Sequence, residues 1–186
     1  TGHMGRGGGK AVKASEEKKD AGGALIPRLT VSGRANSTFN FGNVVKEDFT
    51  VISLTRYNGG SRARILQGSS NWLHGHWGSN VGVAHYDGWK TPERSNQGSE
   101  EWLCYVGQNG GECIHRANGV DVGNGNGGSG NQTLSINAGG HGGEASDWAV
   151  REILTWDRHL EREEILAVER YLGSAHGLTL GPPRPP

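Results

Sequence analysis

Apolar and polar residues alternate with a period of two through most of this chain, and this pattern limits the fold more than any other feature. Successive side chains of a β-strand point to opposite faces, so alternation of this kind predicts strands. The stretch 49–57, FTVISLTRY, carries apolar residues on both faces, which predicts a central strand. Further strands are expected within 62–68, 72–78, 81–89, 100–108, 112–123, 132–140 and 146–158.

One segment near the end of the chain has a helical period instead. Within residues 160–177 the apolar residues Ile165, Val168, Leu172 and Ala175 fall on one stripe, with Glu and Arg on the opposite face. Gly173 or Gly177 can end such a helix. Many closely spaced strands followed by one short helix predict an all-β, two-sheet antiparallel sandwich with a short C-terminal α-helix.

Composition agrees with this fold and excludes some partners. The chain has 33 glycines and 33% hydrophobic residues, as expected for a β-rich domain with many tight turns. Lys plus Arg and Asp plus Glu are equal at 19 each, so we expect no nucleic-acid partner. No apolar run approaches the roughly 18 residues of a membrane-spanning helix, so we expect no membrane insertion.

The two ends of the chain differ from its middle. Residues 1–23 are charged and poor in apolar side chains, which predicts a flexible arm, and the opening TGHMGRGGG is typical of a cloning remnant. Residues 178–186 end in GPPRPP and predict the start of a proline-rich linker. We therefore expect one domain over 24–177, cut from a longer protein.

Cys104 and Cys113 lie on either side of QNGG, residues 108–111, which is typical of a hairpin turn. Folding at that turn places the two cysteines on neighbouring strands, where a disulfide is geometrically conceivable. The alternative is two buried free thiols, which behave as small hydrophobic side chains. Two cysteines alone do not fix the redox compartment.

The stretch NWLHGHWGSNVGVAHYDGW, residues 71–89, concentrates histidine and tryptophan. With Ser79 and Asn80 as a two-residue turn, His74 is expected opposite His85, and Trp77 opposite Gly82. One face of this hairpin would then carry His74, His76, Val83 and His85 toward solvent or a groove. The other face would carry Leu73, Trp77, Ala84 and Tyr86 toward the core.

Two kinds of site follow from that register. His74, His76 and His85 are close enough in it to share a transition metal such as Zn²⁺ or Cu²⁺. A sugar site instead needs aromatic faces beside polar groups, and the residues that could supply both are Asn71, Trp72, His74, His76, His85, Asp87 and Trp89. Against both interpretations, tryptophan in a sandwich is commonly core, and unpaired surface histidines are ordinary.

The C-terminal stretch WAVREILTWDRHLEREEILAVERYL resembles the ending of laminin-G-like, concanavalin A-like jelly-roll domains. The residues that carry the likeness are Glu152, Trp156, Asp157, Arg158, Leu160, Glu163 and Glu164. The upstream stretches DFTVISLTRY and EEWLCYVGQNGGECIHRANGVDVG resemble core strands of the same family, so the likeness covers roughly 25–175. The resemblance implies a jelly-roll sandwich, a fold that hosts lectins, adhesion modules and enzymes.

The same resemblance implies calcium as a candidate cofactor, because many members hold it at a rim of the sandwich. Suitable oxygen ligands in loops are Asp87, Asp121 and Asp147, with Asn124 and Asn126 nearby in sequence. No other cofactor is expected.

For catalysis, hydrolases of this fold place paired carboxylates on one strand, whereas Glu144, Asp147 and Glu152 have spacings that do not share one strand face. The lyases of similar fold use a histidine for which Ile114-His115-Arg116 is the nearest match, without their other motifs. The sequence therefore predicts no enzymatic activity and a ligand-recognition module, most plainly a carbohydrate-binding one on extracellular or cell-surface material. The alternatives are a protein adhesion or assembly domain, and a divergent polysaccharide hydrolase or lyase. The oligomeric state is left open.

Overall fold

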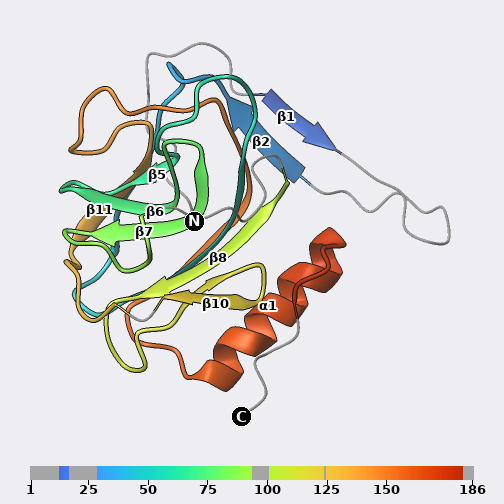
Figure 1. Cartoon of the computed structure of the whole chain (residues 1–186). Coiled ribbons are helices and arrows are strands. Elements are labelled where there is room, and N and C mark those ends of the chain that lie inside the picture. Colours follow the sequence, from blue (N-terminus) through green and yellow to red (C-terminus); the bar gives the residue numbers. More distant parts are fainter. Residues whose placement is uncertain (1–12, 17–28, 94–100, 124, 182–186) are drawn as a thin grey trace, which may run out of the picture.

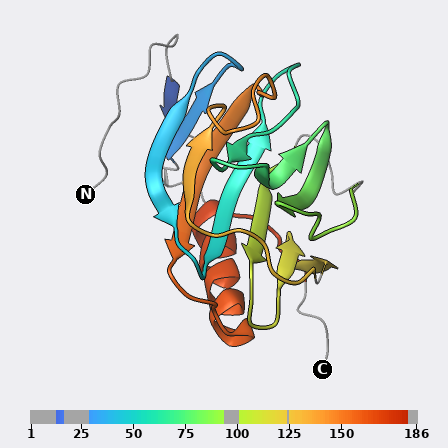
Figure 2. The same cartoon turned by 90° about the vertical axis from the view of Figure 1, so that its left-hand side faces the viewer.

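Two antiparallel β-sheets pack face to face in this protein, and one helix lies against the outer side of the larger sheet (Figures 1 and 2). The structure is a computed structural model that describes residues 13–16, 29–93, 101–123 and 125–181. The predicted all-β sandwich with a short C-terminal helix is confirmed.

The larger sheet has seven strands in the order β1-β2-β12-β4-β8-β9-β10. Their bounds are β1 Lys13–Glu16, β2 Leu29–Gly33, β12 Trp148–Trp156, β4 Thr50–Tyr57, β8 Leu103–Gln108, β9 His115–Ala117 and β10 Val120–Gly123. The turn between β9 and β10 is Asn118-Gly119, with φ of 49° and 81°, as the sequence predicted. The late strand β12 lies between the early strands β2 and β4.

The smaller sheet has five strands in the order β3-β11-β5-β6-β7. Their bounds are β3 Phe39–Val45, β11 Gln132–Ile136, β5 Leu66–Gln67, β6 Trp72–Trp77 and β7 Asn80–Tyr86. The strand expected over 62–68 is thus reduced to two residues, whereas β3 was not predicted.

Both faces of β4 are buried, which confirms the prediction of a central strand. Val51 belongs to the main core between the sheets, together with Phe49, Trp72, Tyr105 and Trp148. Ile52 and Leu54 point the other way and pack in a second cluster beneath the helix.

The helix α1, Arg162–His176, buries Ile165 and Leu172 in this second cluster, and Val168 packs against it. The helix ends at Gly177, whose φ of 59° and ψ of 45° are left-handed. The predicted helical stripe and its glycine stop are confirmed.

The turn between β6 and β7 differs from the prediction by one residue. The central turn residues are Gly78 and Ser79, with φ of 54° and 70°, and Trp77 pairs with Asn80. Two-residue hairpin turns of this type need positive φ at both positions, which glycine supplies without steric cost. A bulge follows between Gly75 and His76, where Gly82 is the extra residue on β7, so His74 pairs with Ala84 rather than with His85.

The cysteines are not joined by a disulfide: both are buried free thiols. Cys104 lies near the start of β8, where its carbonyl accepts a hydrogen bond from the Asn118 N–H (2.8 Å). Cys113 lies in the connection after the opposite end of the same strand. The connection spans six residues, 109–114, rather than a tight QNGG turn, so the two thiols are not cross-strand neighbours.

Parts of both predicted end segments belong to the described structure. Residues 13–16 of the expected arm form β1, which pairs with β2. The remainder of 1–23 lies outside the described residues. In the expected linker, Leu178 and Leu180 pack against the second cluster. The Gly181 N–H donates a hydrogen bond to the Asn118 carbonyl (2.7 Å). Residues 182–186 lie outside the described residues. Among the described helices none is long and apolar enough to cross a membrane.

Candidate ligand-binding face

Three of the predicted ligand-binding residues lie in the interior of the sandwich. Trp72 and His74 are 0% exposed and His76 is 1% exposed. Trp72 stacks on Tyr86 with ring centroids 4.6 Å apart, and His76 packs edge-on against Tyr57. The one-residue change in register put Trp72 and His74 on the core face, so these side chains do not reach solvent.

Two of the buried histidines make polar contacts with tyrosines on neighbouring strands of their own sheets. His74 Nδ1 lies 2.8 Å from the Tyr86 hydroxyl, and His115 Nδ1 lies 3.3 Å from the Tyr105 hydroxyl. Burial lowers the pKa of His74 and of His76 to about 3, and that of His115 to about 4. These rings are neutral at physiological pH and help to build the core.

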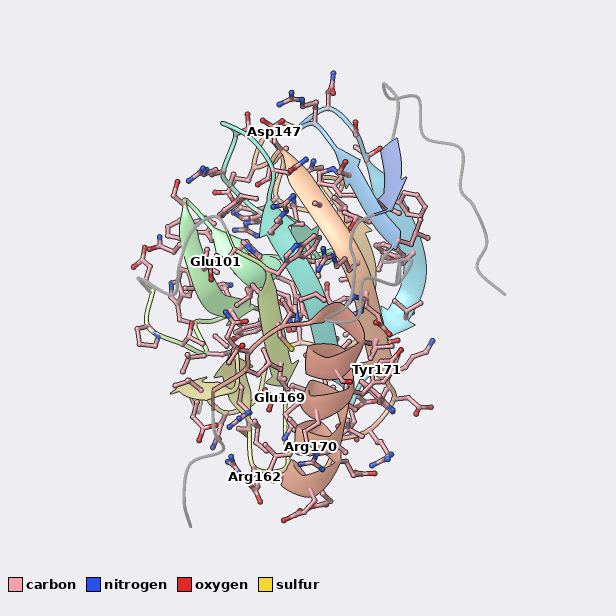
Figure 3. The ribbon with its side chains drawn as sticks, turned by 90° about the vertical axis from the view of Figure 1, so that its right-hand side faces the viewer. Glu101, Asp147, Arg162, Glu169, Arg170 and Tyr171 are labelled. Atoms are coloured by element: carbon pink, nitrogen blue, oxygen red, sulfur yellow. The ribbon has the colours of Figure 1, made fainter. Side chains whose placement is uncertain are left out.

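The predicted metal sites are not assembled. His85 pairs with Leu73 and lies on the opposite face of the hairpin from His74. Asp121 is bound to Arg116 and to Arg162, whereas Asp147 lies at the far end of the sandwich from Arg162 (Figure 3). Asp87 accepts a hydrogen bond from the Ser70 hydroxyl (2.6 Å). Among the described residues no group of three His, Cys, Asp or Glu side chains could hold a metal ion, and Asn124 lies outside them.

The other predicted residues do come together, on the outer face of β6 and β7. Trp89 is the most exposed of the six tryptophans, all of which are described, at 37%. Its ring meets Trp77 at 5.3 Å and 66°, and His85 at 5.1 Å and 85°. These edge-on contacts hold the Trp89 ring in place while part of it stays open to solvent.

Polar side chains adjoin these rings. Glu144 accepts a hydrogen bond from Trp77 Nε1 (3.2 Å) and forms an ion pair with Arg64. Arg64 in turn donates to Asn71 Oδ1 (2.8 Å), and the Asn71 carbonyl lies 2.7 Å from His85 Nδ1. We call this surface the Trp89 face; it consists of Arg64, Asn71, Trp77, His85, Asp87, Trp89 and Glu144.

Asp87 lies next to Asn71 in the Trp89 face and remains charged. Partial burial favours the neutral acid, but hydrogen bonds from the Ser70 and Ser129 hydroxyls and from the Asn71 backbone lower the pKa of Asp87 below its usual range. The face therefore combines an aromatic platform with a fixed carboxylate.

Sequence reasoning missed three members of the Trp89 face. Trp77 was expected on the core face because the sequence analysis placed neither the turn at Gly78-Ser79 nor the bulge at Gly82, which together put Trp77 on the same face as His85. Glu144 lies in the connection between β11 and β12 and Arg64 just before β5, so no strand period placed either of them.

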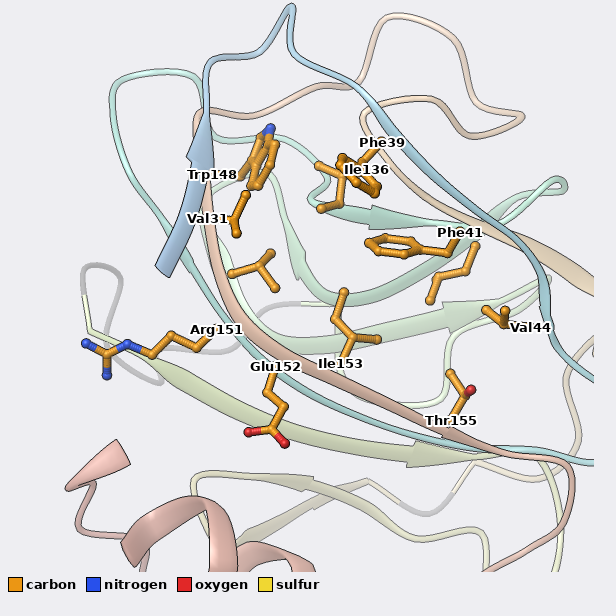
Figure 4. Close-up of a pocket in the computed structure, with 12 residues that line it drawn as sticks. Val31, Phe39, Phe41, Val44, Ile136, Trp148, Arg151, Glu152, Ile153 and Thr155 are labelled. Atoms are coloured by element: carbon orange, nitrogen blue, oxygen red, sulfur yellow. The ribbon is translucent and has the colours of Figure 1, made fainter. Parts of the chain in front are cut away.

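A concavity of about 400 Å³ opens elsewhere, between the sheets beside β3 and β12 (Figure 4). Nine of its twelve lining residues are apolar, including Phe39, Phe41 and Ile153. The charged residues of its lining turn away: the guanidinium of Arg151 lies over Trp102 (4.2 Å), and Glu152 is 2.7 Å from His176. With few polar groups directed inward, it offers less chemistry for recognition than the Trp89 face.

No family model matches the chain, and no curated protein matches it. Among the solved structures that match is the Trypanosoma rangeli sialidase in complex with the inhibitor DANA. The TM-score is 0.51 and the sequence identity 12%, over 86% of this chain and 29% of the sialidase chain. The likeness shows the fold alone. The chain spans less than a third of the sialidase that it matches.

The comparison contradicts the prediction that this chain is not an enzyme, because the matching structure is a sialidase. The absence of a known glycosidase motif therefore does not exclude enzymatic activity in this chain. At 12% identity the match assigns no reaction and no catalytic residue to this chain.

Proposed function

We propose that this protein is a laminin-G-like, concanavalin A-like domain that binds glycans through the Trp89 face, on extracellular or cell-surface material. The observation that carries the proposal is the partly exposed Trp89 ring, fixed edge-on by Trp77 and His85 and bordered by Asn71 and Asp87. A rigid aromatic face can stack on the C–H surface of a sugar ring while neighbouring polar groups bind its hydroxyls. The likeness to a sialidase, an enzyme named for a sugar substrate, agrees with a glycan ligand.

Alanine at the platform tests the proposal. We expect Trp89→Ala to weaken glycan binding at least about tenfold, because it removes the stacking surface. The matched control is Tyr171→Ala, since Tyr171 is 55% exposed on α1, away from the Trp89 face. Both variants and the original chain would be screened on a broad glycan and polysaccharide array, with calcium and with a chelator.

The outcomes of this screen separate the alternatives. Binding that is lost in Trp89→Ala and kept in Tyr171→Ala supports the proposal, and its loss on chelation adds calcium to the site. A blank array from folded protein overturns it. Concentration-dependent self-association in the same sample would then favour protein adhesion.

A second candidate function is glycan hydrolysis, favoured by the match to an enzyme. Glu144 is the carboxylate beside the aromatic rings of the Trp89 face. Product release from the same panel, abolished in Glu144→Gln, would establish this function. Product release that persists in Glu144→Gln would show that residues other than Glu144 carry the activity.

A further inference from the structure

Exposed aromatic side chains are few in this protein. Its three phenylalanines, six tryptophans and four tyrosines all belong to the described residues. Only two of them are exposed, Trp89 at 37% and Tyr171 at 55%. Tyr171 lies on α1, which packs against the large sheet, whereas Trp89 follows β7 of the small sheet. A ligand that rests on Trp89 therefore meets no second exposed aromatic side chain.

The rings that border Trp89 are steeply inclined to it. Trp77 is half-buried, and its plane makes an angle of 66° with that of Trp89, with the ring centroids 5.3 Å apart. The His85 ring stands at 85° to Trp89, with the centroids 5.1 Å apart. A flat surface that lies on the Trp89 ring cannot at the same time lie flat on either neighbour. The Trp89 face thus offers one stacking surface.

Charged side chains of both signs flank Trp89 in the chain. Asp87 precedes it by two residues and is a charged carboxylate. Lys90 follows it directly, and its ammonium keeps its charge while donating to the Asn126 carbonyl (2.8 Å). Removing water from such charges without providing ionic partners is unfavourable. A ligand narrow enough to leave both groups in contact with water is therefore favoured.

We propose that the Trp89 face stacks on one sugar ring of a single, soluble glycan chain and does not dock on the flat surface of an insoluble crystalline polysaccharide. This inference rests on the proposed glycan-binding function. A crystalline surface presents many sugar rings in one plane, so binding to it needs several coplanar aromatic rings. Its hydroxyls are already hydrogen-bonded to one another, so Asp87 and Lys90 would lose water there without gaining partners.

Ligands of one chemistry in different lengths and physical states test the proposal. The probes are the trimer, the hexamer and the crystalline powder of three polysaccharides: cellulose, chitin and β-1,4-mannan. A glycan that binds on the array but belongs to none of these series would be assayed as its own trimer and hexamer. Titration calorimetry gives the dissociation constants of the soluble probes, and sedimentation with the powders measures binding to the crystalline surface.

In any series that binds, we expect the hexamer to bind at most about fivefold more tightly than the trimer. One sugar ring is stacked in both, and the hexamer only adds roughly four overlapping positions for the same contact. A larger gain would show that several sugar rings are stacked, and it overturns the proposal while leaving glycan binding intact. If no probe and no glycan of the array binds to folded protein, the proposed function itself fails.

Two variants assign each measurement to the Trp89 face. Binding to a powder is counted as the part that Trp89→Ala removes and Tyr171→Ala keeps, and we expect none. Sedimentation that depends on Trp89 overturns the proposal. For the soluble probes we expect Trp89→Ala to weaken the binding of trimer and hexamer equally, at least about tenfold. Unchanged binding in Trp89→Ala, with the fold verified by circular dichroism, removes this face as the site and with it both proposals.

Discussion

Gly78 has an influence on this protein well beyond its own turn. Together with Ser79 it closes the β6–β7 hairpin at positive φ, and the pairing of Trp77 with Asn80 follows from that turn. The pairing decides which side chains point inward, because a shift of one residue exchanges the two faces of a strand. The burial of His74 and the position of His85 on the opposite face depend on this turn together with the bulge between Gly75 and His76.

We expect Gly78→Ala to lower the free energy of unfolding by about 1–2 kcal/mol, the cost of a left-handed backbone for a residue with a Cβ. The added Cβ meets only Asn80 Nδ2, at 3.9 Å, so the cost is conformational rather than steric. Gly60→Ala is the control, since a Cβ there meets nothing within 4 Å and no left-handed φ is involved. Urea denaturation measures both, and equal stabilities of the two variants would contradict the explanation.

The helix α1 is fastened to the large sheet by a buried ion pair. Arg116 on β9 contacts Glu169 on α1 at 3.0 Å, and their side chains are 1% and 5% exposed. Arg116 also binds Asp121 (2.5 Å) and donates to the Gly119 carbonyl (2.5 Å). One guanidinium therefore joins the helix to the β9–β10 hairpin.

We expect Glu169→Ala to lower the free energy of unfolding by about 3–5 kcal/mol, because it leaves the buried Arg116 charge without its main partner. Glu163→Ala is the matched control on the exposed side of the same helix. There the loss of an acidic first-turn residue should cost at most about 1 kcal/mol. Similar losses in the two variants, measured by chemical denaturation, would show that the ion pair is not what fastens the helix.

The sequence revealed the elements with a strong period and missed those without one. β4, β8, β12 and α1 were predicted because each carries several apolar residues at regular spacing. β3, with the sequence FNFGNVV, is interrupted by Gly42 at a φ of 82° and pairs irregularly with β11, so its period is broken. The prediction of the site was incomplete for the same reason. Glu144 and Arg64 lie in connections rather than in strands, so no strand period placed them at the Trp89 face.

Protonation of the core couples the stability of the whole molecule to pH. His74, His76 and His115 have a pKa of about 3, 3 and 4 in the folded protein, against about 6.5 when unfolded. The unfolded state therefore binds more protons below pH 6.5, and stability falls as the pH drops toward 4. Each ring should cost about 1.4 kcal/mol per pH unit in that range.

We accordingly expect the free energy of unfolding to fall by about 4 kcal/mol between pH 7.5 and pH 5.5. Urea denaturation at intermediate pH values measures this slope. His76→Gln should remove about a third of it, because one of the three titrating rings is lost. His141→Gln, at an exposed loop position, should leave it unchanged. A flat profile in the original chain would contradict burial of the three histidines.

The position of β12 also has a consequence for the order in which the molecule can form. Residues 148–156 fill the gap between β2 and β4, two strands made more than 90 residues earlier in synthesis. On the ribosome the large sheet stays divided until β12 emerges. Closing it then requires contacts across most of the sequence, which are slow to form. The domain therefore becomes native only after β12 has been synthesised, and shortened chains that lack β12 would expose β2 and β4 as unpaired edges prone to aggregation.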